Sequence, residues 1–197
     1  MDALILAGGE NKRFPVIKGF LEISGKRIIE KNIELLKGIF NKAIISTNNP
    51  EIYFYLSVPM IGDIIEYRGP MTGILSVLTM PDVSEVFVTA CDMPFINAML
   101  IKYIVDKWEK GYDALIPIFD DKPQPLLGIY SKRIAKSMEQ SIKIGERSLR
   151  RFLQGINVLY INEDEVRGTD PEGRSFININ TMEDFQKEIG GEICLVG

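Results

Sequence analysis

The residues of this sequence that could do chemistry stand directly after apolar segments, and the first group follows the run ALIL near the start. Gly8 and Gly9 are adjacent there, and Arg13 and Lys18 come shortly afterwards. Two glycines let the backbone approach a ligand closely and expose amide N–H groups, while the two cations supply positive charge for phosphates. The stretch is neither a Walker A loop, which ends in Gly-Lys-Ser/Thr, nor a GxGxxG fingerprint. A Gly-Gly pair after a strand is only a structural turn about as often as it is a binding loop, but the two basic residues favour phosphate binding.

Two further stretches have the same placement. Gly69 and Gly73 surround an expected helix start, whose N–H groups and dipole would suit an anion or the edge of a base. The structural alternative is a turn followed by tight helix packing at Gly73. Asp92 follows the apolar run VFVTAC, and a lone carboxylate held there suits Mg²⁺, which shares its remaining ligands with substrate phosphates. The alternative for Asp92 is a turn or a helix cap.

The composition excludes several kinds of chemistry. The chain has 197 residues, no His and only two cysteines, Cys91 and Cys194. Ser-His-Asp and Cys-His catalysis, imidazole metal sites and four-thiolate zinc sites are therefore excluded. A formal net charge of −4 argues against a nucleic-acid-binding protein, and no apolar run has the length of a membrane span. The opening MDALILAGGENKR does not read as a signal peptide, so we expect a cytoplasmic protein that binds neither nucleic acid nor membrane.

The elements that must position these residues follow from the hydrophobic pattern, in which apolar runs of strand length alternate with segments of helical period. This alternation predicts βαβ crossovers and a mainly parallel sheet, hence an α/β fold with three layers and a single domain over residues 1–197. A polar turn is expected at 120–122, and the acidic segment 162–174 is expected to be a solvated loop. We expect strands at 3–7, 43–47, 63–67, 86–90, 114–119, 126–130 and 158–161, and helices at 28–40, 71–78, 97–110 and from about 131.

Five motifs, in order over nearly the whole chain, resemble those of one family. The opening LAGGENKRFPVIK is similar to LAGGxSxRMG-x-DK, and GPMTGI at 69–74 is similar to GPLAGI. Cys91-Asp92-Met93-Pro94 resembles CDxP, Gly145-Glu146-Arg147 resembles a G-E-R element, and NINTMED at 178–184 resembles N-x-N-T-P-E-[DE]. These motifs are typical of nucleotidyltransferases with a Rossmann-like fold of the GT-A type. Within that superfamily the last two motifs resemble the molybdenum cofactor guanylyltransferase family.

The resemblance implies transfer of GMP from GTP to the terminal phosphate of molybdopterin, with release of pyrophosphate. It implies Arg13, Lys18 and Asp92 as catalytic residues, Mg²⁺ on Asp92, and Asn178 and Asn180 as contacts of the pterin-bearing acceptor. It also implies other molybdenum-cofactor biosynthesis proteins and molybdoenzymes as partners. The residues that it assigns to nucleotide binding are Leu6, Ala7, Gly8, Gly9, Lys18, Ser46, Asp63, Gly69 and Asp92.

Three departures from the family pattern leave the base and the acceptor open. Ile17 replaces the family's Asp before the lysine, and Ser46 stands where an Asn is expected, with Asn48 nearby. The Asp before the GP element has no direct match, because Tyr67 aligns with it locally and Asp63 lies earlier in the expected strand. Cytidylyl transfer to molybdopterin and transfer to a sugar phosphate are therefore alternatives. A non-catalytic nucleotide-binding domain is less favoured, because Asp92 and Lys18 are both present.

Overall fold

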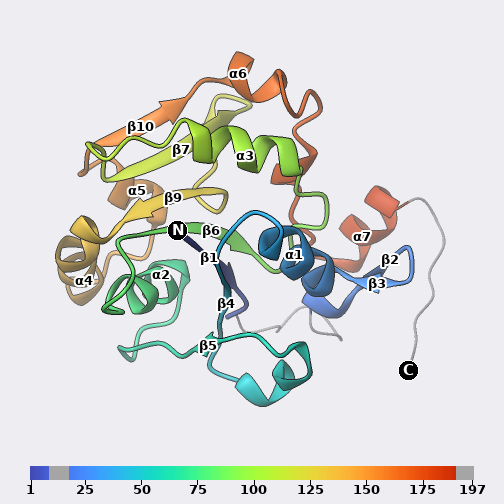
Figure 1. Cartoon of the computed structure of the whole chain (residues 1–197), viewed down its shortest axis with the longest axis horizontal. Helices are drawn as coiled ribbons and strands as arrows, with labels where there is room; N and C mark the ends of the chain where they lie inside the picture. Colours follow the sequence, from blue (N-terminus) through green and yellow to red (C-terminus); the bar gives the residue numbers. More distant parts are fainter. Residues whose placement is uncertain (9–17, 190–197) are drawn as a thin grey trace.

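The computed structural model describes residues 1–8 and 18–189, and its centre is an eight-stranded sheet with the strand order β10-β7-β9-β6-β1-β4-β5, in which β8 pairs with β7 (Figure 1). A separate hairpin is formed by β2 and β3. The strands are β1 (Asp2–Leu6), β2 (Glu22–Ile23), β3 (Lys26–Arg27), β4 (Ala43–Ser46), β5 (Met60–Ile61), β6 (Glu85–Ala90), β7 (Ala114–Phe119), β8 (Lys122–Pro123), β9 (Gly128–Ser131) and β10 (Val158–Ile161).

The sheet is mainly parallel, as the sequence predicts. Strands β6, β1, β4 and β5 run parallel in consecutive pairs, and so do β7 and β10. Among the described residues, every antiparallel pair in this sheet includes β9 or β8. Strand β9 pairs in this way with both β6 and β7, and the short β8 does so with β7. The carboxyl ends of β1, β4 and β6 therefore meet at one edge, which is where open α/β sheets bind ligands.

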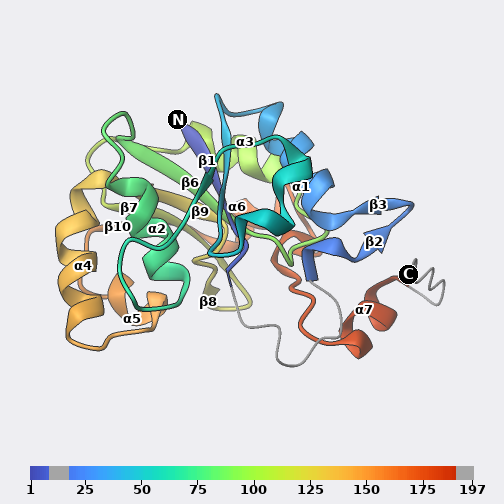
Figure 2. The ribbon, with the colours of Figure 1, turned by 90° about the horizontal axis from the view of Figure 1, so that it is seen from below.

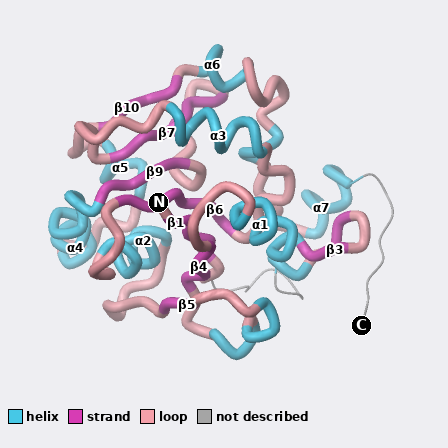
Figure 3. The backbone as a smooth tube through the Cα atoms, in the orientation of Figure 1, coloured by secondary structure: helices cyan, strands magenta, loops and turns pink. Residues whose placement is uncertain are grey.

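Helices cover both faces of the sheet, as Figures 1 and 3 show, with α1 and α3 on one side and α2 and α4 on the other. Consecutive residues of β1 face opposite sides, as strand geometry requires. Ala3 and Ile5 pack in the cluster that includes α1 and α3, whereas Leu4 and Leu6 pack in the cluster that includes α2, α4 and α5. The predicted three-layer α/β fold is thereby confirmed. The helices are α1 (Ile28–Lys37), α2 (Pro70–Leu78), α3 (Ala98–Asp106), α4 (Ala135–Lys143), α5 (Leu149–Leu153), α6 (Glu163–Arg167) and α7 (Met182–Ile189).

The last helix lies at the side of the sheet, next to the β2–β3 hairpin (Figure 2). Ile179 and Phe185 pack there against Leu21, Ile23 and Ile28 in a small third core. This core places the C-terminal motif beside the segment that begins at Lys18, although the two are far apart in the sequence.

The predicted strand at 63–67 is wrong, because β5 is the earlier pair Met60–Ile61 and the chain then forms an irregular loop. The backbone N–H of Asp63 donates to Asn48 Oδ1 at 2.8 Å, and that of Ile64 donates to Ser76 Oγ at 3.1 Å. These donors are satisfied by side chains instead of by a neighbouring strand, so the loop can leave the sheet.

Two other local expectations have different outcomes. The polar turn is confirmed: Asp120 and Asp121 both have positive φ and connect β7 to β8. The expected solvated loop at 162–174 is wrong in part, because it contains helix α6. Asn162 caps this helix by accepting from the N–H of Glu165, whose carboxylate accepts from the N–H of Asn162.

Candidate functional site

A cavity of about 680 Å³ lies at the carboxyl ends of β1, β4 and β6. The backbone hydrogen bonds of the sheet continue one residue beyond β1 and β6. The N–H of Ala7 donates to the carbonyl of Ser46, and the N–H of Cys91 donates to the carbonyl of Leu6. The residues that follow the strands are thus held in fixed positions around the cavity. Every predicted nucleotide-binding residue that the structure describes lines it: Leu6, Ala7, Gly8, Lys18, Ser46, Asp63, Gly69 and Asp92. Gly9 and Arg13, which the resemblance also assigns, lie outside the described residues.

Lys18 brings the two predicted halves of the site together. Its Nζ donates to Asn180 Oδ1 at 2.9 Å and lies 3.5 Å from Asp92 Oδ2. The backbone carbonyl of Asp92 accepts from the N–H of Ile179 at 2.9 Å, which ties the C-terminal motif to the end of β6. A phosphate binding at Lys18 would consequently lie next to both a carboxylate and an amide side chain.

The start of α7 fixes the backbone of Asn180. Asp184 Oδ2 accepts from the N–H groups of Asn180 and Thr181, each at 2.9 Å, and Thr181 Oγ1 accepts from the N–H of Asp184. This reciprocal arrangement of Thr181 and Asp184 is a capping box. Asn178 is placed differently, because its Nδ2 donates to the carbonyl of Phe176 at 3.2 Å.

Burial governs the charges at the end of β6. Only about one fifth of the Asp92 side chain is exposed (19%), and desolvation raises its pKa, while the nearby Lys18 ammonium lowers it by a smaller amount. Burial also raises the pKa of the neighbouring Cys91 thiol to about 12, so the thiol is neutral at physiological pH and is not an activated nucleophile. The charged pair at this edge is Lys18 and Asp92.

Asn48 and Asp63 form the other end of the cavity. Asn48 Nδ2 donates to Asp63 Oδ2 at 2.7 Å, and the N–H of Asp63 donates back to Asn48 Oδ1. The pair fixes a partly exposed carboxylate at the cavity wall, a few residues before the position where the family pattern expects an Asp. Ser46, by contrast, is buried, and a Cβ added at Gly73 would lie 2.5 Å from its Oγ. Gly73 therefore permits close packing of α2 on β4, which is the structural alternative for that glycine.

Sequence reasoning assigned no role to several residues of the cavity wall, although it noted Asn48 near the expected Asn position. Thr47, Asn48 and Asn49 come directly after β4, so the strand-end rule that found Asp92 could also have found them. Tyr53 and Leu126 line the cavity from other parts of the chain, and no sequence signal marks them. Neither Asn178 nor Asn180 is among the lining residues, and Asn180 reaches the site through Lys18.

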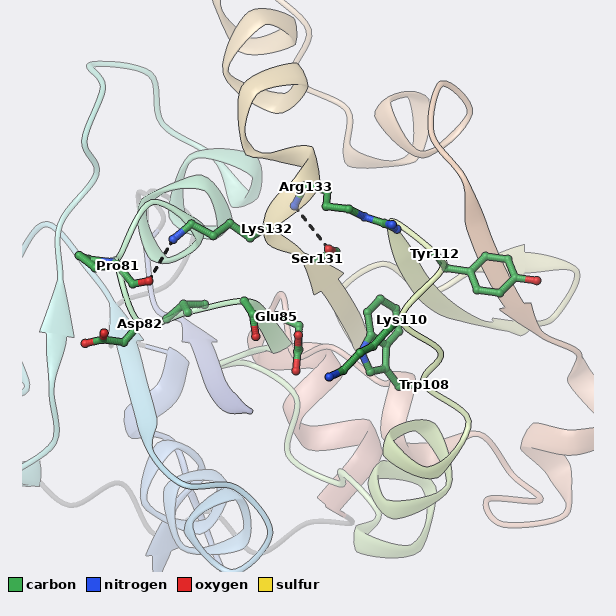
Figure 4. Close-up of a pocket in the computed structure, with 11 residues that line it drawn as sticks. Pro81, Asp82, Glu85, Trp108, Lys110, Tyr112, Ser131, Lys132 and Arg133 are labelled. Atoms are coloured by element: carbon green, nitrogen blue, oxygen red, sulfur yellow. Dashed lines mark hydrogen bonds between the residues drawn. The ribbon is translucent and has the colours of Figure 1, made fainter.

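A second cavity, of about 440 Å³, lies near the opposite edge of the sheet, at the start of β6 and the end of β9 (Figure 4). None of the predicted site residues lines it. Lys132 donates to the carbonyls of Met80 and Pro81, and Arg133 pairs with Asp113 at 3.3 Å. Two of its cations thus already have protein partners, and the strand-end cavity remains the candidate functional site.

Two searches of the described ranges bear on metal and membrane binding. Within residues 1–8 and 18–189, no group of three or more His, Cys, Asp or Glu side chains is arranged to hold a metal ion. None of the helices in those ranges combines the length and the apolar character that crossing a membrane requires.

The three-layer fold, with its mainly parallel sheet, is that of a nucleotidyltransferase, and its strand-end cavity contains a lysine–aspartate pair. Residues 3–164 match the model of the family described as "MobA-like NTP transferase domain". The chain belongs to this family.

Named relatives and a solved structure agree with this assignment. The chain is 36% identical over 191 residues to a probable molybdenum cofactor guanylyltransferase from Peptoclostridium acidaminophilum, covering 94% of this chain and 86% of the relative. It is 34% identical over 186 residues to the molybdenum cofactor guanylyltransferase of Syntrophotalea carbinolica, covering 94% and 89%. The crystal structure of molybdopterin-guanine dinucleotide biosynthesis protein A from Archaeoglobus fulgidus superimposes with a TM-score of 0.83 at 30% identity, covering 96% of this chain and 97% of that one.

Proposed function

We propose that this protein transfers GMP from GTP to the terminal phosphate of molybdopterin, forming molybdopterin guanine dinucleotide and releasing pyrophosphate. The observation that carries the proposal is the contact of Lys18 with both Asp92 and Asn180, since it joins the predicted triphosphate end of the cavity to the predicted acceptor side. The names of four relatives that are 29–36% identical over most of the chain support the same reaction.

The reaction needs positioning and charge neutralisation more than acid–base chemistry. A phosphate oxygen of the acceptor attacks the α-phosphorus of GTP, the new P–O bond forms, and the bond from that phosphorus to the β-phosphate oxygen breaks. A phosphate monoester is largely ionised near neutral pH, so the absence of His from the chain removes nothing that the reaction requires. Lys18 neutralises negative charge on the triphosphate and on the departing pyrophosphate, and Arg13 is proposed to assist it.

The donor set fits a metal ion that is held mainly by the substrate. Asp92 presents a carboxylate at the cavity wall, and the described residues form no cage of several acidic side chains. Mg²⁺ is commonly bound by one or two carboxylates, with substrate phosphates and waters as its other ligands. We assign Mg²⁺ to Asp92, where it would neutralise phosphate charge when bound.

On this proposal the nucleotide occupies the cavity that Leu6, Ala7, Gly8, Ser46 and Gly69 help to line. Asp63 lies at the base end, and Asn180, together with Asn178, serves the acceptor. Gly9 belongs to the same proposed nucleotide loop. We place the activity in the cytoplasm, in a single domain spanning the chain, with other molybdenum-cofactor biosynthesis proteins and molybdoenzymes as partners that receive or supply the cofactor.

The test combines the purified protein with an acceptor, either molybdopterin or a sugar phosphate, and with each of GTP, CTP, ATP and UTP, with and without Mg²⁺. Pyrophosphate release and the mass of the product are measured. We expect product only with GTP and the metal ion. Product with CTP would identify a cytidylyltransferase. Turnover with a sugar phosphate in place of molybdopterin would show that the acceptor belongs to another class of compound. Nucleotide binding without pyrophosphate release for any acceptor would favour the non-catalytic alternative.

A further inference from the structure

The G-E-R element, which the proposed reaction leaves without a role, forms a tightly built loop between α4 and α5. Gly145 takes a positive φ of 94° just after α4. Glu146 Oε1 then accepts from the N–H groups of Arg147 and Ser148 at 2.8 and 2.7 Å, and these bonds lower the pKa of Glu146. Ser148 in turn caps α5 by accepting from the N–H of Arg151. The loop backbone is therefore fixed on both sides of Arg147.

The side chain of Arg147 lies on the ring of Tyr67. Its guanidinium carbon is 4.2 Å from the ring centroid, which is within the range of a cation–π contact. Both residues are exposed, and 40% of Tyr67 is accessible to solvent. The contact connects two segments that are 80 residues apart and have no strand pairing between them.

Tyr67 belongs to the irregular loop that carries part of the cavity wall. The next three residues, Arg68, Gly69 and Pro70, all line the cavity, and Pro70 begins α2. The start of this loop is fixed by the bonds of Asp63 and Ile64 to the side chains of Asn48 and Ser76. The stack of Arg147 on Tyr67 lies near the end of the loop, directly before the cavity-lining residues.

We infer that Arg147 is a positioning residue for nucleotide binding, which acts through Tyr67 and does not touch the nucleotide. By holding Tyr67, it keeps residues 68–70 in the arrangement that lines the cavity. This inference rests on the proposed function, because it assumes that the cavity binds a nucleotide. It predicts an effect on nucleotide affinity, while the rate of the bound complex stays nearly the same.

The size of the effect is limited by the strength of the contact. An exposed cation–π pair is worth so little that its loss can weaken nucleotide binding by only about two- to fivefold. If the guanidinium bonded directly to a substrate phosphate, its removal would lower nucleotide affinity by about tenfold or more. The magnitude therefore separates a positioning role from direct contact.

The experiment titrates GTP into the wild-type protein and into Arg147→Ala, Arg147→Lys, Tyr67→Phe, Tyr67→Leu and the double variant Arg147→Ala/Tyr67→Leu. Arg150→Ala is the matched control, because it removes the same charge from an exposed position three residues away on α5. Amide hydrogen exchange of residues 64–69 is measured on each protein without nucleotide, so that the loop is observed independently of binding. Melting temperatures establish that every variant is folded.

We expect Arg147→Ala and Tyr67→Leu each to weaken GTP binding by about two- to fivefold and to speed exchange in residues 64–69. The double variant should be no weaker than either single variant, because both remove the same contact. Tyr67→Phe and Arg150→Ala should behave like the wild type, and Arg147→Lys should recover part of the loss, because an ammonium also binds an aromatic face.

Several results would overturn the inference. A loss of about tenfold or more in Arg147→Ala that persists in the Tyr67→Leu background would mean that Arg147 contacts the ligand directly. Unchanged affinity or unchanged exchange in Arg147→Ala would mean that the stack positions nothing. A wild-type protein that binds no nucleoside triphosphate would overturn the proposed function as well, whereas normal wild-type binding with a silent Arg147→Ala overturns this inference alone.

Discussion

The ammonium of Lys18 lies 2.9 Å from Asn180 Oδ1, although 162 positions separate the two residues in the sequence. The same ammonium lies 3.5 Å from the carboxylate of Asp92. Sequence motifs assign Lys18 to the triphosphate and Asn180 to the acceptor, as if the site had two separate halves. The contact instead makes Asn180 a partner of the residue that would bind the nucleotide.

The first prediction concerns this coupling. Asn180→Ala should weaken GTP binding as well as acceptor binding, by about three- to tenfold for GTP, because Lys18 loses a hydrogen bond that holds it in place. Lys18→Ala should weaken GTP binding more, and adding Asn180→Ala to it should cost GTP affinity little further. Calorimetric titration of each variant with GTP checks both statements. Additive losses in the double variant would show that Asn180 acts on the nucleotide without Lys18, or that its contribution is structural.

The strand-end positions of the site could be predicted because they depend on simple rules. Continuous apolar runs mark strands that are buried on both faces, and ligands bind where parallel strands end. Gly8, Ser46 and Asp92 follow from these two rules and the family pattern, and all three line the cavity. The proximity of Lys18 to Asn180 could not be predicted from periodicity, because it depends on the small core of Ile179 and Phe185.

The second prediction concerns Asp92 and activity. Asp92→Asn keeps the shape of the side chain and removes the charge that would bind the metal ion. Turnover should fall by about a hundredfold or more, equivalent to at least ~2.7 kcal/mol in the activation barrier. Mg²⁺-dependent pyrophosphate release measures the loss, and circular dichroism establishes that the variant is folded. Near-normal turnover in the folded variant would contradict the assignment of the metal ion to Asp92.

The third prediction concerns Asp92 and stability. Burial raises the pKa of Asp92 in the folded protein, so the fold favours its neutral form. That contribution is fully present below the unfolded-state pKa and is lost as the pH rises through the raised pKa of the folded state. Asp92→Asn should therefore melt at an equal or higher temperature than the wild type at neutral pH, with the difference shrinking on acidification. A clearly lower melting temperature at neutral pH would mean that the pairing with Lys18 outweighs desolvation.

The loop at 62–69 shows why the proposed base end of the site was harder to predict. The apolar letters of DIIEY fit a strand, but Asn48 and Ser76 take the backbone donors of Asp63 and Ile64. Side-chain bonds of this kind depend on residues that approach only in the folded chain. Periodicity therefore predicted the wrong element at this position. The family's Asp has no direct match there, and Asp63, the carboxylate that we took in its place, lies in the cavity wall.

The fourth prediction concerns the choice of base. Guanine presents two neighbouring N–H donors on its pairing edge, and a carboxylate that accepts both is their natural complement. Asp63→Asn should weaken GTP binding by about tenfold and leave the much weaker binding of CTP nearly unchanged, because an amide replaces one acceptor by a donor. Parallel titrations with GTP and CTP measure the ratio. Asn48→Ala should have a smaller effect, since it only loosens the carboxylate, and an unchanged ratio in both variants would place base recognition elsewhere.

The last prediction compares Gly8 and Gly73, two glycines of the family motifs that have different surroundings in the structure. A Cβ at Gly8 would meet no atom of the described structure within 4 Å, and Gly8 lines the cavity. A Cβ at Gly73 would lie 2.5 Å from Ser46 Oγ and 2.7 Å from Leu6 Cδ2. Gly8→Val should therefore fold with a nearly normal melting temperature and lose GTP binding, because its side chain would project toward the space that the nucleotide needs. Gly73→Ala should instead lower the free energy of unfolding by about 1–3 kcal/mol through overpacking. Thermal melts and GTP titrations on both variants give the four values, and a Gly8→Val protein that is folded and binds GTP as tightly as the wild type would show that Gly8 only shapes the turn.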